Sequence, residues 1–157
     1  HARHHYSVFD DQTRGFFTGD TFGMAYQELS SSHLPYIMPT TTPVQFDPEA
    51  WYQTLQRYLE YKPERMFLTH YGMVEEVESL AADLQRRIEC YVQIAESCRG
   101  SNNRTELMKS KIAESTFSEL RKLNCPLPIP ACKGLLAMDI ELNVQGLEIW
   151  LDNKEGG

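Results

Sequence analysis

Metal-competent side chains occur at three places in this chain, and two of them follow a short apolar run. They are His1 at the start of the sequence, Asp20 in the Phe-Thr-Gly-Asp segment and His70 in the Leu-Thr-His-Tyr segment. Such runs are typical of buried strands, and a side chain that follows a strand is held by rigid backbone at an open edge of the sheet. Two imidazoles and one carboxylate suit zinc, iron or manganese, and a carboxylate can also bridge two ions. The sequence therefore predicts a sheet with a metal site at its edge.

The first part of the chain is predicted to form a hairpin that delivers Asp20. Residues 6–9 alternate in polarity, residues 10–15 are rich in turn formers, and residues 16–18 form a second apolar run. Gly19 allows the backbone to turn sharply just before the carboxylate.

The segment from residue 23 to 46 is predicted to be an ordered loop, with a single helical turn near 24–29. A long loop directly after a metal ligand is a good place for substrate recognition. Several of its side chains are candidates for a pocket wall, although a structural role is slightly favoured for each: Tyr26, His33, Tyr36, Thr40, Thr41 and Thr42.

A helix and a third strand are predicted to follow. Asp47 is a good N-cap, Pro48 suits the first helical position, and Lys62-Pro63 ends the helix. One face of this helix is apolar and should pack on the sheet that includes residues 66–68: Trp51, Leu55, Tyr58 and Leu59.

From Gly72 onward the sequence is predicted to be helical. The first helix carries an apolar stripe from Val77 to Val92, and Asn103 with Glu106 resembles a capping box for the second. Residues 124–130 read as a rigid linker without a helix. A third helix is predicted over residues 134–151, apolar on more than one face and therefore buried or at an interface.

Three segments together resemble the second half of a metallo-β-lactamase-fold hydrolase with a glyoxalase II-like pattern. They are the His-x-x-x-His of His1 and His5, the Thr-Gly-Asp that ends at Asp20, and the Thr-His-Tyr-Gly that contains His70. The resemblance implies an α/β (α+β) fold, with residues 1–73 as half of an αββα sandwich and residues 74–157 as a helical extension. The upstream His-x-His-x-Asp-His loop of that family is absent here, so the chain is expected to be the C-terminal portion of a longer protein.

The resemblance also implies a mechanism. Two divalent metal ions, with zinc first and iron or manganese as alternatives, would be held by His1, Asp20 and His70, with Asp20 bridging them. A metal-bound hydroxide would attack a small ester, thioester, lactone or phosphoester. His5 would orient the site, and Tyr71 would reach the oxyanion or simply pack as an aromatic. His4 is more simply read as structural, whereas Thr18 and Thr69 should hydrogen-bond to backbone or to metal-bound groups.

The amino-acid composition limits which classes of binding partner and which cellular compartment the sequence predicts. A net charge of −7 argues against nucleic-acid and anionic-membrane partners, and the basic pairs such as Arg86-Arg87 read as solvated helix faces. The four cysteines have no CxxC spacing, so they are expected to be reduced thiols of a cytoplasmic protein, with a disulfide as the second alternative and zinc as the third.

The helices after residue 73 are expected to form a lid over the site or a homodimer interface. The competing interpretation is a non-catalytic binding module that keeps the fold and interacts through its helical tail.

Overall fold

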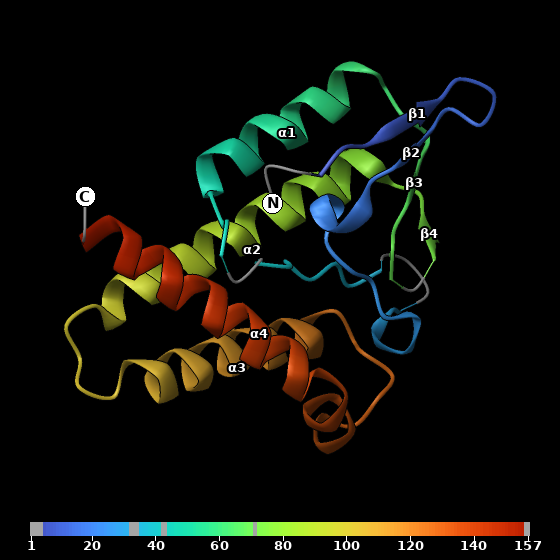
Figure 1. Ribbon diagram of the computed structural model, residues 1–157. Helices are drawn as coiled ribbons and strands as arrows, with labels where there is room; N and C mark the ends of the chain where they lie inside the picture. The colour runs from blue at the N-terminus through green and yellow to red at the C-terminus, as the bar shows by residue number, and fades with distance from the viewer. Residues whose placement is uncertain (1–4, 32–34, 42–43, 71, 156–157) are drawn as a thin grey trace.

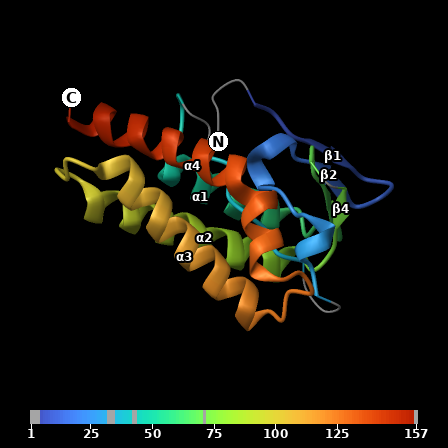
Figure 2. The same cartoon turned by 90° about the horizontal axis from the view of Figure 1, so that it is seen from below.

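A four-stranded sheet and four α-helices make up the fold, which confirms the predicted α+β character. The computed structural model describes residues 5–31, 35–41, 44–70 and 72–155. The sheet has the order β1-β2-β3-β4 and lies at one end of the molecule, with the helices on one side of it (Figures 1 and 2). Its strands are β1 (Val8–Asp10), β2 (Gly15–Phe17), β3 (Arg65–Phe67) and β4 (Met73–Val74).

The strands combine a hairpin with a parallel crossover. β1 pairs antiparallel with β2, and β2 pairs parallel with β3 after the chain has passed through α1 (Pro48–Glu60). The three predicted strands are present within one or two residues of their expected bounds. β4, which pairs antiparallel with β3, was not predicted, because two residues carry no periodicity of their own. The expected domain boundary after residue 73 falls inside this strand, and the division into two domains stays a prediction.

Alternation along the strands gives the sheet two apolar faces. The inner face, toward the helices, is buried at Phe16, Met66 and Val74. The outer face carries a second row, also in register across all four strands: Val8, Phe17, Phe67 and Met73. Val8, Phe17 and Met73 are 50%, 52% and 45% exposed, and the rings of Phe17 and Phe67 stack with centroids 4.6 Å apart. An apolar row of this length on one face is unusual for a solvated sheet.

The helix α1 forms as its sequence predicts. The Asp47 carboxylate accepts a hydrogen bond from the amide of Ala50 at 3.1 Å, and Pro48 occupies the first helical turn. Trp51, Leu55 and Tyr58 are buried, as expected for the apolar face.

Three longer helices form the rest of the core: α2 (Val77–Cys98), α3 (Arg104–Lys122) and α4 (Ile129–Glu155). The central one is α2, which contacts α1, α3 and α4 (Figure 1). The prediction that α4 begins at residue 134 was wrong. The helix already includes Pro130 in its first turn, where the missing N–H of proline leaves no intrahelical hydrogen bond unmade. The capping box was wrong as well: Asn103 stands at the N-cap position without a side-chain cap, and Glu106 pairs with Lys109 at 3.2 Å.

The expected solvated face at Arg86-Arg87 was wrong for Arg87, which is 3% exposed. Its Nη1 donates to the carbonyl of Ile37 at 2.8 Å, and its Nε donates to Glu119 at 2.7 Å. The guanidinium carbon also lies 4.5 Å from the ring centroid of Tyr36. A sequence pattern could not reveal this role, because the partners come from a loop and from another helix.

All four cysteines are free thiols, with the sulfurs of Cys125 and Cys132 3.8 Å apart. Among the described residues, no helix combines the length and the apolar character that crossing a bilayer requires.

Candidate metal centre

The parallel pairing of β2 and β3 brings Asp20 and His70 together. Phe17 and Phe67 are register partners, and each candidate ligand follows its phenylalanine by three residues. The two side chains therefore meet at the edge where both strands end, with Nε2 of His70 3.5 Å from Oδ1 of Asp20. Both remain accessible to solvent, since the side chains are 53% and 30% exposed. A contact between side chains this exposed adds little stability, so their proximity reflects the strand register.

The backbone around Asp20 is held from several directions. Asp20 lies in the 3-10 turn η1 (Gly19–Phe22), which Gly19 enters with a φ of +55°. Its carbonyl oxygen accepts hydrogen bonds from the amide of Gly23 at 2.9 Å and from the hydroxyl of Thr40 at 2.7 Å. The next carbonyl, that of Thr21, accepts from Nε1 of Trp51 at 2.6 Å. These contacts fix the turn relative to the core before any ligand binds.

The turn that carries His70 is closed by a hydrogen bond from the amide of Leu68 to the carbonyl of Gly72 at 2.9 Å. Gly72 has a φ of +101°, a conformation that favours glycine. On the other strand, Thr18 hydrogen-bonds through its hydroxyl to the carbonyls of Gly19 and Phe67, as the sequence predicts for a backbone contact. The two turns are thus tied to each other as well as to the sheet.

Two further predicted site residues, His5 and Tyr36, lie in different surroundings. His5 lies beside the Asp20 turn, with its Nδ1 3.8 Å from where a β-carbon would stand on Gly19. Tyr36 is almost wholly buried beneath Arg87, where burial raises its pKa to about 12, so its role is structural. Five predicted residues lie outside the described part of the chain: His1, His4, His33, Thr42 and Tyr71.

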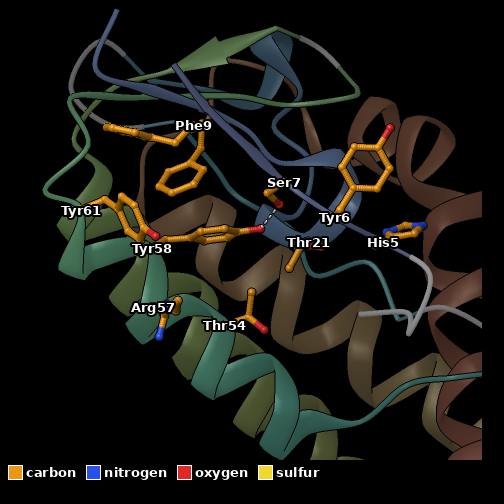
Figure 3. A pocket seen from close by; sticks show the side chains of 10 residues that line it. His5, Tyr6, Ser7, Phe9, Thr21, Thr54, Arg57, Tyr58 and Tyr61 are labelled. Atoms are coloured by element: carbon orange, nitrogen blue, oxygen red, sulfur yellow. Dashed lines mark hydrogen bonds between the residues drawn. The ribbon is translucent and has the colours of Figure 1, made fainter. Parts of the chain in front are cut away.

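A groove of about 380 Å³ runs between the segment that leads into β1 and helix α1 (Figure 3). Aromatic rings, hydroxyls and one guanidinium line it: His5, Tyr6, Ser7, Phe9, Phe16, Thr21, Thr54, Arg57, Tyr58 and Tyr61. The hydroxyls of Ser7 and Tyr58 are 2.5 Å apart, and burial raises the pKa of Tyr58. Because Thr21 belongs to η1 and His5 lies beside Gly19, the groove reaches the turn that carries Asp20.

Two polar residues of α4 near the site were not singled out from the sequence. The hydroxyl of Tyr26 donates to Oδ2 of Asp139 at 2.8 Å, and Asn143 hydrogen-bonds with Thr41. Burial raises the pKa of Asp139, although the Tyr26 hydrogen bond and the charge of His70 oppose the shift. The signal that could have found them is their spacing, since they stand four residues apart in a helix that is otherwise apolar on that side.

The raised pKa of Asp139 has a measurable consequence for stability. The folded state holds this proton more tightly than the unfolded state, so the contribution of Asp139 to stability falls as pH rises from below the ordinary value of 3.8 through the folded pKa. Asp139→Asn keeps an oxygen for Tyr26 and removes the titration. Urea unfolding from about pH 4 to pH 7 should show the variant gaining stability relative to the wild type as pH rises. A stability of the variant, relative to the wild type, that stays constant or falls as pH rises would contradict the assignment.

Comparisons with known proteins give one partial similarity. No protein family model matches the chain, and no solved structure matches it. A metallo-beta-lactamase fold-containing protein from Sulfurisphaera tokodaii is 36% identical over 74 residues. That segment makes up 47% of this chain and 24% of the relative, so the match spans about a quarter of the relative's length. Over this part, the chain is similar to a protein of the metallo-β-lactamase fold.

Proposed function

We propose that this chain belongs to a metal-dependent hydrolase of the metallo-β-lactamase superfamily, in which His1, Asp20 and His70 are ligands to two divalent ions. Zinc is the first choice, with iron or manganese as alternatives, and the substrate is a small ester, thioester, lactone or phosphoester. The observation that carries the proposal is the 3.5 Å separation of the His70 and Asp20 donor atoms at the shared edge of two parallel strands.

The two described candidates fit a zinc ion. Donors that each lie about 2.0–2.1 Å from one tetrahedral ion are roughly 3.4 Å from each other, which is close to the observed separation. Among the described residues there is no group of three or more His, Cys, Asp or Glu side chains arranged to hold a metal. His1, the third proposed ligand, lies outside them.

The protein's own residues would position the ligands and the substrate. When bound, the metal would acidify a water molecule and polarise the substrate oxygen. The Asp20 carboxylate has two oxygens, so it can bridge two ions, and His5 would orient the site through hydrogen bonds from beside Gly19. Tyr71 would stabilise the oxyanion. The groove that starts at Thr21 and His5 would hold the organic part of the substrate against its aromatic rings.

The outer face of the sheet supports the proposed αββα sandwich. A second sheet packed on this face would bury the row of Val8, Phe17, Phe67 and Met73. The predicted homodimer would instead use the helices, where α4 exposes Met138 and Leu142 four residues apart, 73% and 44% exposed. Both arrangements are proposals, as is the cytoplasmic location.

The proposal is tested by zinc titration against a competing chelator, with His70→Ala, Asp20→Asn and the exposed control Asp11→Asn. Loss of a direct ligand should weaken zinc binding by more than about a hundredfold, the upper end of what outer partners of a ligand contribute. Asp11→Asn should bind as the wild type does. Elemental analysis should find at least one ion fewer per chain in His70→Ala.

Equal zinc affinity in all four proteins would show that the ions bind elsewhere and would overturn the ligand assignment. A chain that takes up none of the three metals would favour the alternative, a non-catalytic module that keeps the fold and interacts through its helices.

A further inference from the structure

The buried side chain of Asn143 on helix α4 hydrogen-bonds to the loop of residues 35–41 and holds it against the helix. Asn143 is 2% exposed, and its Oδ1 accepts hydrogen bonds from the amide and the hydroxyl of Thr41 at 2.8 and 2.9 Å. The Thr41 hydroxyl also lies 2.8 Å from the backbone carbonyl of Asn143, and Nδ2 of Asn143 donates to the carbonyl of Asp139 at 2.9 Å. Both polar ends of this amide are therefore satisfied, one by the loop and one by its own helix.

Gly146 allows the helix to approach the loop closely. A β-carbon at this position would stand 2.7 Å from the carbonyl oxygen of Thr41 and 2.8 Å from its Oγ1, so any larger residue would push loop and helix apart. The other glycine of α4, Gly134, has open space around it. The two glycines thus differ in their surroundings while sharing a helix.

Thr40, the neighbour of Thr41, connects this loop to the candidate metal centre. The hydroxyl of Thr40 donates to the carbonyl of Asp20 at 2.7 Å, the same carbonyl that receives the amide of Gly23. The loop has two further anchors: the bridge between Met24 and Met38 and the bond from Arg87 to the carbonyl of Ile37. A displacement of residues 40–41 would therefore move the peptide group that follows the Asp20 side chain.

We propose that α4 sets the position of Asp20, with Asn143, Gly146 and Thr40 as positioning residues of the metal centre. The role of Asp20 as a ligand rests on the proposed function, whereas the mechanical link from α4 to the η1 turn does not. The helical region is then a structural determinant of the site, in addition to any role as a lid or an interface.

Amide hydrogen exchange tests the link without metal. Gly146→Ala should make the Gly23 amide exchange about tenfold faster, because the turn that holds it opens more often. Gly134→Ala is the matched control and should leave that rate unchanged. Thr40→Val removes the hydroxyl and should act as Gly146→Ala does, while Thr40→Ser keeps it and should behave as the wild type. Ile112→Val, in the core of α3, controls for a general loss of stability.

Zinc affinity gives the second readout, and it should fall about tenfold in Gly146→Ala and Thr40→Val only. If exchange at Gly23 does not distinguish Gly146→Ala from Gly134→Ala, α4 does not hold the turn and the proposal is wrong. It is also wrong if exchange accelerates while zinc binds with unchanged affinity. If no form of the chain binds zinc, the proposed function fails, and the exchange rates alone decide whether α4 positions the turn.

Discussion

Arg87→Ala is expected to lower the free energy of unfolding by about 3–5 kcal/mol, the range for breaking a buried ion pair, because Glu119 and the carbonyl of Ile37 lose a buried donor. The guanidinium contacts Asp83 and Glu119, and it also holds the carbonyl of Ile37. Its loss would therefore weaken the contact of α2 with both α3 and the loop that carries Thr40. Urea unfolding followed by circular dichroism measures the change.

Arg86→Ala is the matched control, since Arg86 precedes Arg87 and contacts the same two carboxylates, Asp83 and Glu119. Its side chain is 53% exposed, so its removal should cost no more than about 1 kcal/mol. Equal losses in the two variants would contradict the special role of the buried guanidinium.

The same network predicts a dependence on acid. Burial raises the pKa of Glu119, but the hydrogen bonds from Arg86 and Arg87 outweigh it, and the pKa lies below its ordinary value of 4.5. A lowered pKa contributes stability that is present above the unfolded value and is lost as pH falls through the folded one. The loss of stability in acid should therefore be shallower in Arg87→Ala than in the wild type.

Trp51→Ala is expected to cost about 3–5 kcal/mol, the range for removing a large aromatic side chain from a core. Trp51 is fully buried, packs edge-on against Phe46 with ring centroids 6.0 Å apart, and donates to the carbonyl of Thr21. The cavity and the lost hydrogen bond both act next to Asp20. Urea unfolding should register the loss, and zinc affinity should fall with it.

Trp51→Phe separates packing from hydrogen bonding, because it keeps an aromatic ring and removes the indole N–H. It should cost about 1–2 kcal/mol, mostly for the missing donor. A loss as large as that of Trp51→Ala would show that the hydrogen bond, and not the ring, supports the core.

Local sequence patterns predicted the elements whose stabilising contacts join residues close together in the sequence. The Asp47 cap, the buried face of α1 and the strands on either side of it follow from side chains close together in sequence. The meeting of Asp20 and His70 was also predictable, since parallel strands end at the same edge of a sheet. Their role as ligands stays a prediction.

Long-range contacts account for what the sequence did not reveal. The burial of Arg87 depends on a loop fifty residues away, and the role of Asp139 depends on Tyr26. The capping box predicted at Asn103 did not form for a different reason. Its residue types were suitable, but Glu106 pairs with Lys109. Neither the long-range contacts nor the pairing of Glu106 with Lys109 produces a periodic pattern in the sequence.

The hydrogen bonds between α4 and the early loop also set an order of events during synthesis. Tyr26 is separated from Asp139 by 113 positions and Thr41 from Asn143 by 102. The ribosome synthesises the hairpin and the loop first. The hydrogen bonds that join the loop to α4 cannot form until α4 has emerged as well. The sheet edge that carries Asp20 and His70 therefore lacks part of its support until α4 has been synthesised, and these two side chains are held less firmly in a nascent chain than in the folded protein.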